Sequence, residues 1–185
     1  MITDEIIIAQ TKKWIKDVVV GCNFCPFAAR ELKRGSIYYE VIKSKERKAA
    51  LEALAQAFYQ LDENKKIETI LLILPGGFNS FSDYLQLVTL AESLLKKEGY
   101  EGIYQVASFH PEYLFATAAT DDPANYTNRS PYPMLHLLRE ESLSHAIDNY
   151  PDTEKIPQKN IDFAKAKGLA YMQLLRQACT SDDIK

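Results

Sequence analysis

Residues 67–77 have the sequence Ile-Glu-Thr-Ile-Leu-Leu-Ile-Leu-Pro-Gly-Gly, which contains the longest strongly apolar run of the chain. The part from Ile67 to Leu74 has the length of a strand, and its hydrophobicity indicates burial on both faces. The Pro-Gly-Gly sequence at 75–77 is typical of the turn that ends such a strand. A strand buried on both faces needs a helical layer on each side of its sheet, so this segment predicts an α/β fold.

Amphipathic and β-branched segments alternate on both sides of this run. Apolar spacing predicts helices, and β-branched and aromatic enrichment predicts strands. The expected helices are at 7–18, 45–61, 80–97, 135–147 and 157–178, and the other expected strands are at 36–42 and 103–109. Strands that alternate with helices favour right-handed crossovers and a parallel sheet.

We therefore predict a single α/β domain over residues 1–185. Its sheet is expected to be small and mostly parallel, with three or four strands packed by helices and with extra helices at the C-terminal end. A short fourth strand at 113–119, antiparallel to the third, is the alternative, and it would give a mixed, ferredoxin-like sheet. Residues 179–185 are expected to form a flexible tail.

Composition excludes several classes of protein. Of the 185 residues, 46% are hydrophobic and 25% are charged, as in ordinary globular proteins. The net charge of −3 provides no global footprint for nucleic acid. No apolar run approaches the roughly 18 residues of a membrane span. Three cysteines and an acidic N-terminus argue against a secreted disulfide framework. We expect a cytoplasmic protein with neither a nucleic-acid nor a membrane partner.

The segment from Phe109 to His136 is the expected functional region. Ligands of open parallel sheets bind outside the carboxyl ends of the strands, and this segment follows the third predicted strand. A long loop inside a compact domain is usually functional or disordered, and three prolines favour an ordered loop here. We therefore expect this loop to lie over the edge where the three strands end.

Donor groups cluster near the end of this loop, just before an expected helix. An arginine beside amides and a helix N-terminus suits a carboxylate or a phosphate, so we predict a site for a small anionic molecule. The alternative is structural, with Asx turns and a helix cap. The candidate ligand-binding residues are Asn125, Asn128, Arg129, Ser130 and His136.

His110 ends the third predicted strand, where a general acid or base would stand. A structural histidine at a strand end is the equal alternative. His136 is expected in the first turn of a helix, with Glu140 one turn later on the same face. Asp121 and Asp122 would assist catalysis. The candidate catalytic residues are Cys25, His110, Asp121 and Asp122.

Two further motifs bear on the chemistry. Cys22 and Cys25 form a Cys-x-x-Cys that follows a helix instead of a strand and has no second pair, which disfavours thioredoxin-like and zinc functions. Cys25 is the thiol of interest, because Pro26 would begin a short helix beside it; a buried hydrophobe is the alternative. Gly76 and Gly77 lack the rest of a phosphate loop, so a tight turn is expected, although their amides remain candidate anion contacts.

Three stretches resemble a bacterial family catalogued as domain of unknown function 1415. They are Asn-Phe-Cys-Pro-Phe-Ala at 23–28, Phe-His-Pro at 109–111, and Asn-Arg-Ser-Pro-Tyr-Pro-Met-Leu-His-Leu-Leu-Arg-Glu at 128–140. The resemblance spans nearly the whole chain. An apolar residue is common in the family where Cys22 stands, which weakens a Cys-x-x-Cys mechanism. The resemblance implies no particular activity.

These patterns leave three hypotheses for function. The leading one is a small-molecule enzyme of hydrolase or transferase type that binds an anionic or phosphorylated ligand at loop 109–136. The first alternative is a non-catalytic binding module that uses the aromatic and proline-rich loop. The second alternative is a thiol or zinc protein acting through Cys25. No motif indicates a particular cofactor or a resident metal.

Overall fold

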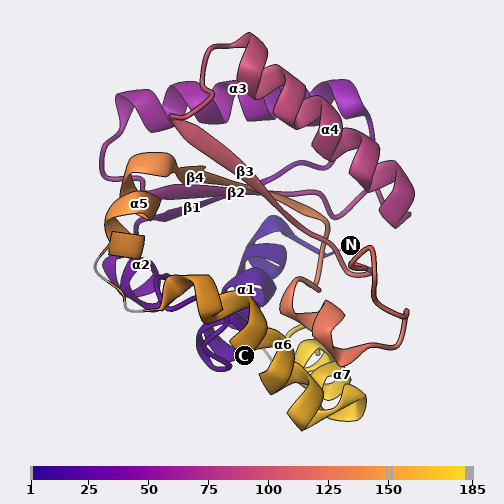
Figure 1. Cartoon of the computed structure of the whole chain (residues 1–185). Helices are drawn as coiled ribbons and strands as arrows, with labels where there is room; N and C mark the ends of the chain where they lie inside the picture. Colours follow the sequence, from indigo (N-terminus) through magenta and orange to yellow (C-terminus); the bar gives the residue numbers. More distant parts are fainter. Residues whose placement is uncertain (1, 149, 151, 182–185) are drawn as a thin grey trace.

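A computed structural model describes residues 2–148, 150 and 152–181. Helices cover both faces of one open four-stranded sheet in the order β1-β2-β4-β3 (Figure 1). The strands are β1 (Ile37–Val41), β2 (Thr69–Ile73), β3 (Tyr104–Phe109) and β4 (Met134–Arg139). The helices are α1 (Asp4–Trp14), α2 (Ala28–Arg34), α3 (Arg47–Glu63), α4 (Phe81–Lys97), α5 (Glu140–Asp148), α6 (Ile156–Lys167) and α7 (Leu169–Gln177). The predicted single α/β domain is confirmed.

The prediction of a mostly parallel sheet is wrong. β1 pairs with β2 in parallel, but β4 pairs antiparallel with both β2 and β3. Because β4 opposes both neighbours, β1, β2 and β3 still run in one direction, and their carboxyl ends share one edge as expected. The error lies in β4, which is inserted antiparallel between β2 and β3.

The fourth strand is also not where the alternative placed it. Residues 113–119 contain turns and no strand, whereas Met134–Arg139, expected to begin a helix, forms β4. The sequence Met-Leu-His-Leu-Leu-Arg is too short for its periodicity to distinguish a strand from a helix. Two flanking strands offer hydrogen-bond partners there, and this tertiary pairing decides the conformation. The expected helix begins only at Glu140, as α5.

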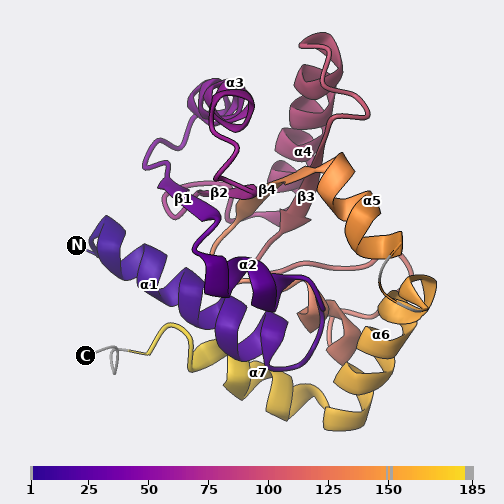
Figure 2. The same cartoon turned by 90° about the vertical axis from the view of Figure 1, so that its left-hand side faces the viewer.

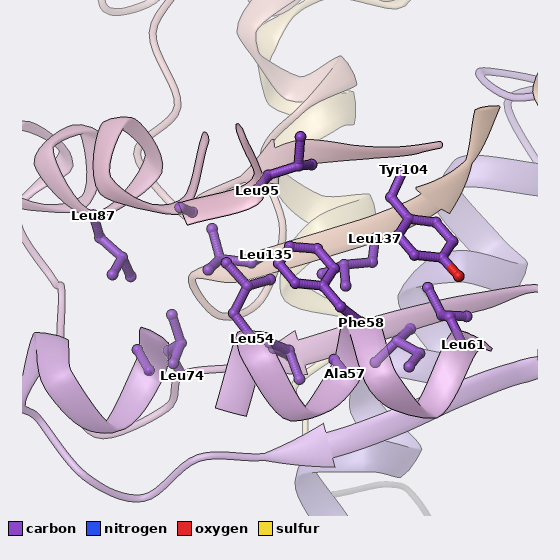
Figure 3. Close-up of a cluster of buried hydrophobic side chains, with 14 of the residues drawn as sticks. Leu54, Ala57, Phe58, Leu61, Leu74, Leu87, Leu95, Tyr104, Leu135 and Leu137 are labelled. Carbon is purple, nitrogen blue, oxygen red and sulfur yellow. The ribbon is translucent and has the colours of Figure 1, made fainter. Parts of the chain in front are cut away.

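Helices α3 and α4 cover one face of the sheet, and their apolar stripes form the first core (Figures 1 and 3). The predicted stripe of α3 is buried throughout, as Leu54, Phe58 and Leu61 show. Leu135 and Leu137 of β4 face the same core. Since successive strand residues point to opposite faces, Met134, His136 and Leu138 point to the other side of the sheet.

The other face is covered by α1, α2, α5 and the π-helical segment η1 (Ile15–Val20), with α6 and α7 packed beyond them (Figures 1 and 2). Its core includes Trp14, Ile73, Met134 and Met172. η1 ends at Gly21, where a side chain would clash with the carbonyl oxygen of Asp17.

The predicted helix at 157–178 is divided at Gly168, whose φ of 80° separates α6 from α7. In the expected tail, the side chain of Cys179 is buried, and residues 182–185 lie outside the described residues. No helix in the described part of the chain is long and apolar enough to cross a membrane.

Candidate functional site

A cavity of about 240 Å³ lies between the sheet and the helical layer of α1, η1, α2 and α5. We call it the sheet pocket. β2, β3 and β4 provide its floor, with Leu71, Ala107 and His136 in adjacent register positions. Its walls are mostly hydrocarbon, and the aromatic side chains are Trp14, Phe27 and Phe109. The arrangement suits an apolar occupant.

His136 is the main polar group of the floor. Its side chain lies deep in the protein yet keeps part of its surface open, because that part faces the cavity. Burial lowers the pKa of His136 to about 4, so the imidazole is neutral at pH 7. The ring packs against Phe109, with centroids 5.9 Å apart. A neutral imidazole offers one donor nitrogen and one acceptor nitrogen.

Thr69 decides which nitrogen of His136 carries the proton. The Thr69 hydroxyl donates to the carbonyl oxygen of Leu137, and its oxygen lies 2.6 Å from Nε2 of His136. Because the single hydroxyl proton is already engaged, Nε2–H of His136 donates to Thr69 Oγ1. The Nδ1 atom is then the acceptor, and no described residue provides a hydrogen bond to it.

The pocket lining contains two carboxylates and two guanidinium groups, so their formal charges cancel. Glu31 accepts hydrogen bonds from Arg30 Nε and Ser36 Oγ, each at 2.6 Å. Burial alone would raise the pKa of Glu31, but these two bonds bring it below its usual value. The Arg139 guanidinium donates to the backbone carbonyls of Leu61 and Ile67. The Arg139 guanidinium is therefore held by backbone carbonyls, and the Arg30 guanidinium is paired with Glu31 through its Nε.

Two buried polar atoms of pocket residues have no hydrogen-bond partner within the described chain. They are Nε1 of Trp14 and Oε1 of Glu68. Leaving such a group unsatisfied costs about 1–3 kcal/mol, so a ligand that paired with either atom would recover part of that cost.

Cys25 lines the same pocket, just before the short helix α2, as expected. Burial raises the pKa of its thiol, and hydrogen bonds from the amides of Phe27 and Ala28 offset this only in part. The thiol is thus protonated at neutral pH, which makes it a weak nucleophile. Cys22 is buried outside this pocket. No group of three or more metal-ligating side chains occurs among the described residues.

His110 lies at the end of β3, at the predicted edge, and is completely buried. Its Nε2 lies 2.8 Å from the carbonyl oxygen of Phe78, and its Nδ1 accepts from the amide of Glu112 at 2.9 Å. Both ring nitrogens are therefore engaged with the backbone. Burial lowers the pKa of His110, which keeps the ring neutral. These contacts correspond to the structural alternative.

The loop 110–133 is ordered by its own polar side chains. Asn125 is fully buried; its Oδ1 accepts from the amide of Phe115 and its Nδ2 donates to the carbonyl of Ala119. Asp122 caps the 3₁₀ helix η2 (Pro123–Thr127) by accepting from Ala124. Ser130 donates to the carbonyl of Tyr132 and does not cap a helix, because β4 follows.

Arg129 has the same role in this loop. Its Nε donates to the carbonyl of Tyr113 at 3.0 Å and its Nη2 to that of Thr120 at 2.9 Å. The guanidinium also lies 4.8 Å from the ring centroid of Tyr126. Asn128 contacts the neighbouring Thr127 hydroxyl, and Asp121 is exposed. The loop residues that were predicted to bind an anion therefore make hydrogen bonds within the loop.

Gly76 and Gly77 form the tight turn that the sequence predicted. A side chain on Gly76 would meet the carbonyl oxygen of Lys43 at 2.7 Å, because the chain leaving β1 crosses this turn. Of the predicted site residues, Cys25 and His136 line the sheet pocket. The others belong to the loop or to this turn.

Sequence reasoning did not select Trp14, Glu68 or Thr69. A signal for two of them was present, since Glu68 and Thr69 are the polar residues within the apolar run at 67–74. Trp14 had no such signal, because a tryptophan on the apolar face of a helix is normally core.

The comparisons with known proteins identify the family. A model described as "Protein of unknown function (DUF1415)" matches residues 6–174. The chain belongs to this family. The match includes both the sheet pocket and the loop 110–133. No curated protein and no solved structure matches the chain.

Proposed function

We propose that this member of the DUF1415 family binds a small, largely apolar molecule in the sheet pocket, with His136 as the polar contact. The observation that carries the proposal is a mainly hydrocarbon cavity of about 240 Å³ with an imidazole acceptor in its floor. A dry cavity of about 150 Å³ is known to admit benzene. A bicyclic aromatic ring or a branched chain of similar size therefore suits this one.

The chemistry of the lining supports binding more than catalysis. Ligand pockets are typically apolar with a few placed polar groups, and this pocket has that composition. An enzyme of hydrolase or transferase type, with Cys25 as nucleophile, is the second candidate, because Cys25 and His136 line the same cavity. The raised pKa of Cys25 and the lowered pKa of His136 disfavour an activated thiolate–imidazolium pair.

Filling the cavity tests the proposal. Ala107 lies beside His136 on β3, so Ala107→Leu adds carbon directly to the pocket floor. With indole as the probe, calorimetry should show binding to the wild type and an affinity at least about tenfold lower for Ala107→Leu. Ala170→Leu, on the exposed part of α7, is the matched control and should bind like the wild type.

A second variant that fills the cavity keeps the test informative if Ala107→Leu does not fold. Ala28→Leu enlarges the opposite wall, on α2. Circular dichroism should show folded protein for at least one of the two variants, and that variant should bind indole weakly. Wild-type affinity in a folded filling variant, or no binding of indole to the wild type, would contradict the proposal.

A further inference from the structure

We propose that the sheet pocket selects molecules that carry a hydrogen-bond donor and no negative charge, and that Nδ1 of His136 accepts the hydrogen bond. This inference rests on the proposed function and names the chemical class of the ligand. The class is a neutral aromatic or aliphatic molecule with one N–H or O–H group.

The preference for a donor follows from how the sheet holds His136. In the β2–β4 register, Leu71 is opposite His136 and Thr69 is opposite Leu138, so the threonine lies diagonally from the histidine on the same face. Its hydroxyl is fixed by donation to the carbonyl of Leu137. The threonine oxygen can then only accept from His136 Nε2. Nδ1 of His136 is therefore unprotonated, and its lone pair can accept a hydrogen bond.

A ligand that donates a hydrogen bond to Nδ1 of His136 avoids the desolvation cost of leaving this acceptor without a partner. No described residue hydrogen-bonds Nδ1, and the imidazole is part of the cavity floor. An apolar molecule that covers the floor removes water from this acceptor and returns no hydrogen bond. A molecule of equal size with a correctly placed donor restores one. Two isosteric ligands should therefore differ in affinity through this bond alone.

The exclusion of anions follows from the charges around the pocket. Glu31 and Glu68 bring two carboxylates to the lining, and Arg30 and Arg139 are the lining cations. Arg30 is paired with Glu31, and Arg139 donates to backbone carbonyls. An anionic ligand would lose its hydration and meet the carboxylate of Glu68, and the two described lining cations would offset this less because each already has a hydrogen-bond partner.

Two matched pairs of probes test the inference by calorimetry at pH 7. Indole has an N–H donor, and benzofuran has the same shape without it. Indole-3-carboxamide is neutral, and indole-3-carboxylate is an anion of nearly equal size. We expect indole to bind at least about fivefold tighter than benzofuran, and the carboxamide at least about tenfold tighter than the carboxylate.

Variants assign the preference to His136. His136→Leu should keep benzofuran binding and reduce the preference for indole to within about twofold. His145→Leu makes the same change at an exposed histidine outside the lining and should leave the preference intact. Thr69→Val removes the group that fixes the tautomer, so it should weaken the preference without abolishing benzofuran binding.

Nitrogen NMR of the histidine side chains gives a readout that does not depend on these variants. Nδ1 of His136 should appear as an unprotonated nitrogen and should shift when indole is added, but not when benzofuran is added. Equal affinity for indole and benzofuran, or tighter binding of the carboxylate, would overturn the inference and leave the proposed function standing. If indole and benzofuran both fail to bind the wild type, the proposed function itself falls.

Discussion

The sheet pocket and the loop 110–133 each contain a buried, neutral histidine in a polar setting, and the two settings differ in one respect. In the loop, both ring nitrogens of His110 are hydrogen-bonded to the backbone. In the pocket, His136 uses Nε2 on Thr69, and no described residue engages its Nδ1. The loop has many polar side chains, but most of their hydrogen-bonding groups are engaged. The pocket has few polar side chains, and several of their hydrogen-bonding groups have no partner among the described residues.

This difference separates a structural region from a candidate binding site. A long loop at a sheet edge has many backbone groups that need partners, and its asparagines, aspartates and Arg129 supply them. A pocket instead needs groups that remain available to a ligand. In this chain, the polar density of the loop corresponds to groups that are engaged after folding, whereas the hydrogen-bonding groups that no described residue engages lie in the sheet pocket.

The largest effect expected from the comparison of loop and pocket is a loss of stability when a buried polar side chain of the loop is removed. Asn125→Ala leaves the amide of Phe115 and the carbonyl of Ala119 without their partner. The free energy of unfolding should fall by about 3 kcal/mol in urea denaturation. Asn79→Ala, at an exposed asparagine, should change it by less than about 0.5 kcal/mol. A loss in Asn125→Ala no larger than in this control would show that the loop is not held by its polar side chains.

The second effect is acid sensitivity from His136. Its pKa is about 4 in the folded protein, against 6.5 for the unperturbed side chain. The unfolded chain therefore binds the proton first, so the stabilisation is present above pH 6.5 and is lost as the pH falls toward 4. Urea denaturation should show a decrease on the order of 2 kcal/mol from pH 7 to pH 5.

A variant of His136 shows how much of this pH dependence comes from that side chain. His136→Gln should reduce the decrease, and His110, whose pKa is also lowered by burial, should contribute to the remainder. A decrease of unchanged size in His136→Gln would place the acid-sensitive group elsewhere.

The third effect distinguishes the loop from the pocket in ligand binding. Arg129→Ala removes hydrogen bonds to the carbonyls of Tyr113 and Thr120 and should lower the free energy of unfolding by about 1–2 kcal/mol. Indole affinity should stay within about twofold of wild type, because Arg129 does not line the sheet pocket. If phosphate stabilised the wild type in thermal denaturation but not Arg129→Ala, the anion site predicted from the sequence would be restored.

The smallest effect is on Cys25. Burial raises the pKa of its thiol, so iodoacetamide at pH 7 should alkylate it more slowly than a free cysteine peptide. Indole should slow the reaction further, since Cys25 lines the pocket. Peptide mass spectrometry reports each of the three cysteines separately. Rapid alkylation of Cys25 that indole does not affect would favour the thiol-protein alternative and separate Cys25 from the ligand site.

The sequence predicted most elements because their signals are local. The period-3.6 stripe of α3 and the apolar run of β2 each appear within one segment. Cys25 was also selected from its local setting, and it lines the pocket. β4 was missed because its conformation depends on pairing with two strands that are distant along the chain, as the pairs Leu71–His136 and Ala107–His136 illustrate.

By itself, the sequence determined the α/β class, the shared direction of β1, β2 and β3, and the position of the long loop that follows β3. Only the tertiary structure decided that β4 lies between β2 and β3 and that His136 faces a cavity beside Thr69 and Cys25. The physical reason is that periodicity and turn chemistry act over a few residues, whereas a pocket is formed by side chains from distant segments. Whether a histidine nitrogen is engaged depends on those distant neighbours, as the contrast between His110 and His136 shows.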